Sequence, residues 1–164
     1  MERSFKWCRQ EIAEFCLEKE EHVHVAVTTP AYRMITPKCG RPTLNMRFWD
    51  LNPHEIRKRK VYKDDPVEGE EFCSKCFSPD QAKQLLDFIG NAPQGHLVVV
   101  NCEAGISRSA GIVLALRTYY GGDIEEIFEK AYPNLYVADT LGKLLGVGPF
   151  PPREPEGVED LFGP

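Results

Sequence analysis

The hydrophobic and polar positions of this chain predict short strands alternating with amphipathic helices. His22–Thr28 reads His-Val-His-Val-Ala-Val-Thr, and Thr43–Trp49 is a second run of strand-forming residues. Residues 96–101 contain Leu-Val-Val-Val, an apolar run typical of a buried central strand. In residues 2–20 the apolar side chains recur at helical spacing, so a helix is expected there.

Helix signals surround the most apolar of these strands. Ser78 and Gln81 have the spacing of a capping box, and the apolar face that follows predicts a helix over 79–90. Residues 109–120 are apolar and helical, and Asp123 begins another helix by the same capping logic. Strands and helices that alternate along the chain indicate a single α/β domain with a central, mostly parallel sheet flanked by helices.

Three segments depart from this pattern. Residues 30–42 hold prolines and a glycine, which predicts a loop. Residues 52–77 form a charged insertion, basic in its first half and acidic in its second, and we expect a long connection there. Proline and glycine dominate the C-terminal residues. We therefore expect one domain over 1–146 and a poorly ordered tail over 147–164.

Composition narrows the class of protein. With 164 residues, of which 42% are hydrophobic, the chain can bury one core. No apolar run is long enough to cross a bilayer, and the first residues do not resemble an export signal, so we expect a cytoplasmic protein with no membrane partner. Six cysteines without such a signal predict free thiols. A net charge of −5 argues against a nucleic-acid partner. The oligomeric state is not indicated.

The segment from Cys102 to Ser109 carries the chemistry. It lies between the most apolar strand and a helix, where backbone N–H groups and the positive helix end form an anion site. A cysteine in such a turn is a nucleophile, because the positive surroundings favour its thiolate. Arg108 can bind two phosphate oxygens, Gly105 allows a tight turn, and Ser109 can hydrogen-bond the sulfur. The sequence therefore predicts a phosphate-binding loop.

The run Cys102-Glu-Ala-Gly-Ile-Ser-Arg-Ser109 resembles the Cys-x5-Arg loop of the cysteine-dependent protein tyrosine phosphatases, most closely the small dual-specificity branch. Phe77–Ile89, Phe48-Trp49-Asp50 and Pro133-Asn134 also resemble segments of that family. One departure is Asn101, where the family has a histidine, and this replacement predicts a less activated thiol and slower turnover.

The resemblance implies a hydrolase that works without a cofactor or metal. Cys102 would form a cysteinyl-phosphate, and an aspartic acid would protonate the leaving group. Substrate oxygens would be held by the loop residues Glu103, Ala104, Gly105, Ile106, Ser107 and Arg108. The expected substrate is a phosphorylated protein, at phosphotyrosine and also at phosphoserine or phosphothreonine. Two alternatives stay open: a pseudophosphatase that binds phosphate without turnover, and a phosphatase of a non-protein phosphomonoester.

Two assignments carry alternatives of their own. Asp50 follows an expected strand, as the family pattern requires for the general acid, whereas Asp64 and Asp65 lie at a more usual separation from Cys102. We favour Asp50. Cys73 and Cys76 have the spacing of half a zinc site, and one of them could instead form a disulfide with oxidised Cys102. With no second pair in the chain, two free thiols are the favoured interpretation.

Overall fold

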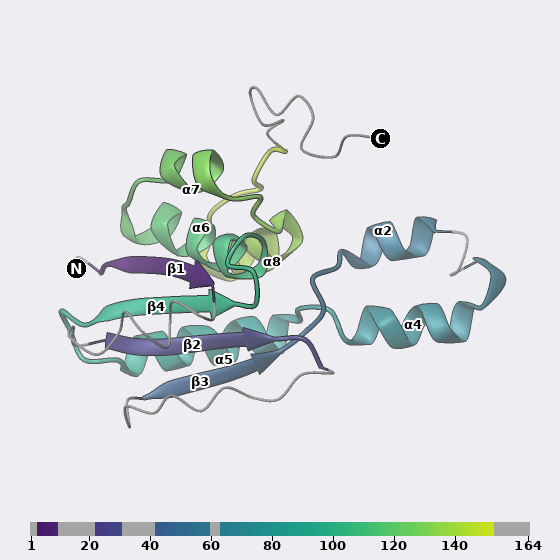
Figure 1. The fold of residues 1–164 in the computed structure, drawn as a ribbon, viewed down its shortest axis with the longest axis horizontal. Coiled ribbons are helices and arrows are strands. Elements are labelled where there is room, and N and C mark those ends of the chain that lie inside the picture. The colour runs from purple at the N-terminus through teal and green to yellow at the C-terminus, as the bar shows by residue number, and fades with distance from the viewer. Residues whose placement is uncertain (1–2, 10–21, 31–41, 60–62, 153–164) are drawn as a thin grey trace.

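Four strands form one sheet in which every neighbouring pair is parallel. The structure is a computed structural model, and it describes residues 3–9, 22–30, 42–59 and 63–152. The strand order is β1-β4-β2-β3 (Figure 1). The strands are β1 (Phe5–Arg9), β2 (His22–Thr28), β3 (Thr43–Arg47) and β4 (Leu97–Cys102). The predicted parallel sheet is therefore confirmed, with the most apolar strand near its centre.

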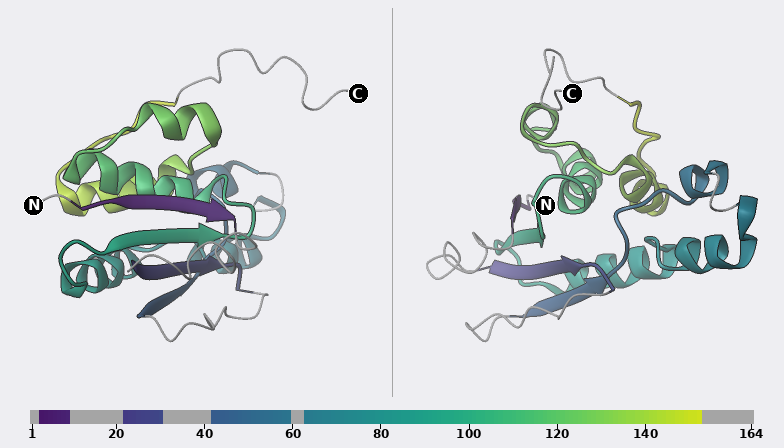
Figure 2. Two further views of the ribbon diagram at one scale, coloured as in Figure 1. Left: turned by 60° about the vertical axis from the view of Figure 1, so that its left-hand side comes forward. Right: turned by 45° about the vertical axis from the view of Figure 1, so that its right-hand side comes forward.

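Helices flank this sheet, as the sequence predicts. The main helices are α5 (Pro79–Asn91), α6 (Arg108–Tyr120), α7 (Glu125–Lys130) and α8 (Leu135–Leu145). Helix α6 packs on β1 and β4, α5 contacts β3, and α8 packs on both α5 and α6 (Figure 2). The core includes alternate side chains of β2 and β4, namely Val23, Val25, Val27, Val98, Val100 and Cys102. Because side chains alternate along a strand, the other face of these strands carries polar residues such as His24 and Asn101.

The predicted capping residues lie at or next to the starts of two helices. Ser78 and Gln81 form the reciprocal capping box of α5, which runs one residue past the expected stop at Gly90. Asp123 accepts hydrogen bonds from the backbone N–H groups of Glu125 and Glu126 at the start of α7. These local signals therefore located helix starts correctly.

The first segment differs from its expected helix. Phe5–Arg9 is the strand β1, paired in parallel with Val98–Cys102 of β4. Two apolar residues three positions apart fit one turn of helix, but pairing with a buried neighbour strand decides the conformation of so short a segment. The remainder of this prediction, residues 10–21, and most of the predicted 30–42 loop lie outside the described residues.

The charged insertion is a long connection between β3 and α5, as predicted, but it contains two helices and is not a plain loop. It contains α2 (Pro53–Lys58) and α4 (Pro66–Ser74). Each begins with a side-chain cap followed by a proline: Asn52 accepts from the N–H of His54, and Asp65 accepts from two N–H groups of α4. Arg57 of the basic half pairs with Glu70 of the acidic half, N to O 3.4 Å. Figure 1 shows the two helices projecting beside the sheet.

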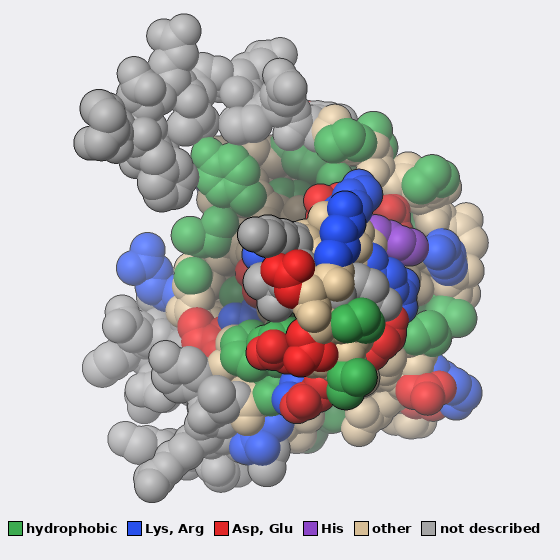
Figure 3. Space-filling view, turned by 90° about the vertical axis from the view of Figure 1, so that its right-hand side faces the viewer, with side chains coloured by type: hydrophobic (Ala, Val, Ile, Leu, Met, Phe, Trp, Pro, Cys, Tyr) green, Lys and Arg blue, Asp and Glu red, His purple; other side chains and the backbone are tan. Residues whose placement is uncertain are grey.

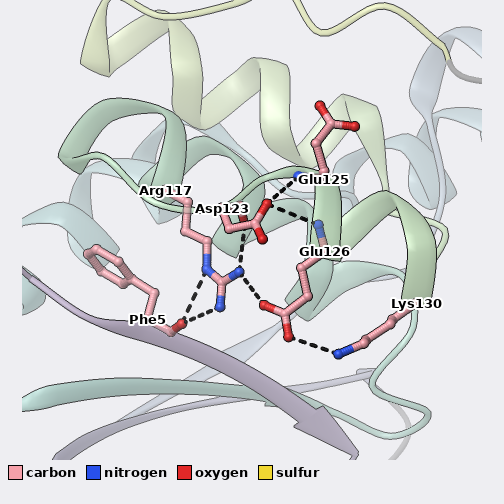
Figure 4. Close-up of polar contacts among 6 residues, drawn as sticks. All are labelled: Phe5, Arg117, Asp123, Glu125, Glu126 and Lys130. Carbon is pink, nitrogen blue, oxygen red and sulfur yellow. Dashed lines mark hydrogen bonds and ion pairs between the residues drawn. The ribbon is translucent and has the colours of Figure 1, made fainter.

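Arg117 ties the edge strand to the helical layer (Figure 4). Its guanidinium donates to the carbonyl of Phe5 in β1, to the carbonyl of Asp123 and to the Glu126 carboxylate of α7. It also lies 4.9 Å from the centre of the Trp7 ring. One side chain of α6 therefore connects the first strand with the α6–α7 turn.

The first residues after α8 pack on the domain. Phe150 is 9% exposed, belongs to the core, and donates its N–H to Asp139 at 2.8 Å. Val147 packs against the same core. Among the described residues, no helix combines the length and apolar character that crossing a bilayer requires.

Candidate active site

The predicted phosphate loop is the turn between β4 and α6. Cys102 ends β4 and is 2% exposed, and its sulfur lies 3.1 Å from the Ser109 hydroxyl oxygen. Gly105 has φ +68°, and a Cβ there would lie 2.3 Å from the backbone nitrogen of Arg9. Only glycine fits both this backbone conformation and the close approach of β1. The nucleophile candidate therefore sits in a tight loop beside a hydroxyl that can bond its sulfur.

Arg108 begins α6 and carries a buried charge. The residue is 5% exposed, and its Nη1 donates to the carbonyl of Phe48 at 3.1 Å, while Nη2 pairs with Glu103. Its Nε is buried and has no hydrogen-bond partner within the described part of the chain. Burial lowers the pKa of Arg108, opposed by the nearby Cys102 and Asp50. An arginine stays protonated at neutral pH. The Nε–H of Arg108 is therefore a buried donor on a positively charged group, suited to an anionic acceptor in this loop.

The side chain of Glu103 makes two contacts that the sequence did not reveal. It was expected to bind substrate as one residue of the loop, but its side chain also contacts its surroundings. One carboxylate oxygen accepts the Thr29 N–H at 2.8 Å, and the other pairs with Arg108. Thr29 directly follows β2. The acidic residue type was visible in the sequence, but its contact with the backbone just after β2 was not.

Asp50 contacts the loop through Ser107. Its exposed carboxylate accepts the Ser107 hydroxyl at 2.8 Å and the Asn134 side-chain amide at 2.7 Å through the same oxygen, Oδ1. Asp64 is exposed, and Asp65 caps α4. The structure thus brings Asp50, and neither residue of the alternative pair, into contact with the loop that follows Cys102.

Asn134 links three parts of the site, a role that the sequence did not reveal. Its Oδ1 accepts the Val137 N–H and so caps α8, while its own N–H donates to the Ser107 carbonyl, both at 3.1 Å. Gly111 of α6 allows this approach, because a Cβ there would lie 2.5 Å from the Asn134 carbonyl oxygen. The Pro133-Asn134 pair before an apolar helix was the available signal.

Asn101, which precedes the nucleophile, pairs with a histidine from the neighbouring strand. Its side-chain oxygen lies 2.5 Å from His24 Nε2, and the two residues are 0% and 3% exposed. Burial lowers the pKa of His24, partly opposed by the Asn101 hydrogen bond, and the neighbouring His22 lowers it further. The expected histidine position thus holds an amide bonded to a histidine of β2.

Each cysteine of the insertion has a weak hydrogen bond to a backbone carbonyl. Cys73 donates to the carbonyl of Pro53 at 3.9 Å and Cys76 to that of Phe72 at 3.6 Å. Burial raises the pKa of Cys76 to about 11, so the thiol form predominates at neutral pH. The described residues contain no cluster of three or more side chains suited to a metal ion. The pair alone is therefore an incomplete ligand set.

A groove of about 580 Å³ separates the inserted helices from α8. Acidic and basic side chains mix on this face of the molecule (Figure 3). The groove is lined by Pro53, His54, Arg57, Glu70, Cys73, Ser74, Pro79, Tyr136, Thr140, Lys143 and Leu144. It holds neither Cys102 nor Arg108, so it is separate from the loop.

Solved structures with a similar fold include the following three. Tk-PTP in the active form matches with TM-score 0.55 and 16% identity, over 87% of this chain and 90% of its own. The human tyrosine phosphatase-like serine/threonine/tyrosine-interacting protein matches with TM-score 0.46 and 20% identity, over 87% and 91%. PTPMT1 in complex with PI(5)P matches with TM-score 0.43 and 16% identity, over 87% and 90%.

The chain therefore has a fold similar to that of Tk-PTP, in agreement with the fold that the resemblance of its loop implied. At this level of identity the likeness establishes the fold. No family model and no curated protein matches the sequence.

Proposed function

We propose that this protein is a cysteine-dependent phosphomonoester hydrolase that acts on phosphotyrosine, with phosphoserine and phosphothreonine as further substrates. The observation that carries the proposal is the unpartnered Arg108 Nε, a buried donor in the loop that follows Cys102. A phosphate oxygen satisfies such a donor and supplies a charge opposite to that of the guanidinium. The phosphatase fold supports the same chemistry.

The reaction would proceed in two displacements at phosphorus. The Cys102 sulfur attacks phosphorus while the bond to the leaving oxygen breaks, and Asp50, in its acid form, gives that oxygen a proton. Water then attacks the cysteinyl-phosphate, passes a proton to Asp50, and releases inorganic phosphate and the thiolate. The Ser109 hydroxyl, 3.1 Å from the sulfur, stabilises the departing thiolate.

Arg108 and the amides of residues 103–108 would stabilise the charge that develops on the phosphoryl oxygens. The N-terminus of α6, a helix of 13 residues, adds to the positive potential at the loop. Each interaction acts on the transferring group rather than on the rest of the substrate. These residues thus suit phosphomonoesters as a class. Specificity among phosphomonoesters must come from residues at the rim of the site.

An apolar rim supports an aryl ester as substrate. Ile106 of the loop and Tyr132 are 42% and 51% exposed, and the Tyr132 N–H donates to the Ile106 carbonyl at 3.1 Å. This hydrogen bond joins the backbones of two residues whose exposed side chains are suited to contact with an aromatic ring. A phosphotyrosine ring entering toward Cys102 would pass this pair, which favours phosphotyrosine among the phosphorylated residues.

The direct test is hydrolysis of an aryl phosphate by the wild type, Cys102→Ser and Arg108→Ala, with EDTA present throughout. We expect turnover by the wild type alone, with inorganic phosphate still binding to Cys102→Ser and not to Arg108→Ala. Turnover that survives in Cys102→Ser would contradict the proposed nucleophile. Phosphate binding by a wild type that does not turn over would favour a phosphate-binding module, the alternative supported by Asn101 in place of histidine.

A further inference from the structure

Glu103 places a carboxylate inside a loop that is otherwise suited to hold an anion. Both of its oxygens are engaged, one by the Thr29 N–H at 2.8 Å and the other by Arg108. The Glu103 side chain is 28% exposed, and that of Arg108 is 7% exposed. Since rotation into solvent would break both contacts, the negative charge is held against the guanidinium.

A guanidinium this deeply buried needs a compensating charge. Leaving a buried charge without its partner is strongly destabilising. The Phe48 carbonyl, which accepts from Nη1, is an uncharged acceptor and cannot supply that compensation. The charge of Asp50 also favours the protonated guanidinium, but its Oδ1 accepts from Ser107 and Asn134, whereas Glu103 is the carboxylate that pairs directly with Arg108. Glu103 therefore compensates Arg108 while no phosphate is bound.

We propose that Glu103 is the resident counter-ion of Arg108 and sets the anion affinity of the site. A phosphoryl group that binds the loop takes over the compensation of Arg108, but it does so beside a fixed carboxylate. The affinity for phosphate is therefore weaker than Arg108 and the loop amides alone would give, and the inorganic phosphate product leaves more readily. The inference rests on one part of the proposed function, the binding of phosphate to this loop, and does not require turnover.

The direction in which one substitution changes the phosphate affinity tests the proposal. We would titrate inorganic phosphate calorimetrically into the full chain, as wild type, as Glu103→Gln and as Glu71→Gln. The last variant removes an equal charge from an exposed ion pair between Glu71 of α4 and Lys75, which directly follows that helix, and is the matched control. We expect about tenfold tighter binding by Glu103→Gln, the size of a moderate coupling between neighbouring sites, and wild-type affinity in Glu71→Gln.

The opposite result overturns the proposal. If Glu103 merely supported the loop, its loss would weaken phosphate binding, so equal or weaker binding by Glu103→Gln is incompatible with a competing counter-ion. A second variant, Glu103→Asp, retains the charge, and we expect it to bind phosphate within about twofold of wild type. If Glu103→Asp instead matches the tighter binding of Glu103→Gln, the charge is not the cause and the proposal fails.

Thermal unfolding keeps the test usable if Glu103→Gln is unstable. The Tm of that variant should be lower than the wild-type Tm without phosphate, and saturating phosphate should raise it by a larger amount. A smaller rise than in the wild type would also overturn the proposal. Aryl phosphate turnover is measured separately, so a chain that binds phosphate without hydrolysis would contradict the proposed enzyme while leaving the counter-ion inference intact.

Discussion

Asn134 donates its side-chain amide to Asp50 at 2.7 Å, although the two residues are 84 positions apart in the chain. The same asparagine caps α8, so the placement of the candidate general acid depends on the start of a helix. The Ser107 hydroxyl bonds the same Asp50 oxygen, which links the acid to the phosphate loop as well. The acid, the loop and α8 therefore form one connected unit.

Removing the Asn134 amide should slow the proton-transfer step. Asn134→Ser keeps a good helix cap but cannot reach Asp50, and Asn134→Ala loses both contacts. We expect both variants to lower kcat by about tenfold for aryl phosphates with poor leaving groups, a fraction of what a general acid contributes. Only Asn134→Ala should also lose about 1 kcal/mol of unfolding free energy in urea. Equal kcat in wild type and Asn134→Ser would show that the contact does not position Asp50.

The choice of Asp50 over the acidic pair can be tested by leaving-group dependence. Asp50→Asn should lower kcat/KM by about 100-fold for a poor leaving group, and by less than about tenfold for an activated aryl phosphate. Asp65→Ala removes the cap of α4 and should cost about 1 kcal/mol of stability while leaving turnover intact. Asp64→Ala should change neither quantity. A selective loss of poor-leaving-group activity in Asp64→Ala or Asp65→Ala, with Asp50→Asn active, would reverse the assignment.

His24 should make the stability depend on pH. Burial lowers its folded-state pKa below the unfolded value of about 6.5, so the unfolded chain binds a proton first as the pH falls. The unfolding free energy should therefore decrease below about pH 6.5 and level off only below the folded pKa. Urea unfolding at about pH 7.5 and about pH 5.5 measures the difference.

The matched variants for that measurement are His24→Gln and His54→Gln. Glutamine can still donate to Asn101 but does not titrate, so His24→Gln should lose most of this pH dependence. His54 is exposed, and its replacement should leave the dependence as in the wild type. If the two variants give the same curve, the buried His24 is not its source.

Arg117 should contribute more to stability than any surface ion pair. Arg117→Ala removes the contacts to Phe5, Asp123 and Glu126 together, and we expect a loss of about 2–4 kcal/mol in unfolding free energy. Lys130→Ala, which breaks an exposed pair with the same Glu126, should cost less than about 0.5 kcal/mol. Chemical denaturation of both variants provides the comparison. Similar losses in the two would mean that the β1 contacts add little.

The sequence predicted those features that local patterns determine. The apolar run of β4, the capping box of α5 and the loop from Cys102 to Ser109 all lie within a few residues of their own signals. The error at Phe5–Arg9 arose because that strand is determined by pairing with β4, about 90 residues away by the register of Phe5 with Val98. The helices of the insertion carried readable caps at Asn52 and Asp65, which the charge pattern obscured.

The side-chain partners within the site could not be predicted from the sequence. Asp50, Ser107 and Asn134 meet because β3, the loop and α8 converge in three dimensions, and no spacing encodes that convergence. The pairing of Glu103 with the Thr29 backbone, and that of Asn101 with His24, likewise joins β4 or its loop to β2. Their residue types were visible in the sequence, whereas the contacts depend on the order of the strands.

The strand β1 lies at the edge of the sheet, and its last residues form one wall of the loop at Gly105. Edge strands open more readily than central ones, because only one side of the strand is paired. Fraying of β1 would therefore loosen the anion site while the rest of the domain stays folded. Fusion partners or crosslinks placed on the N-terminal residues thus offer a way to control the loop from outside the site.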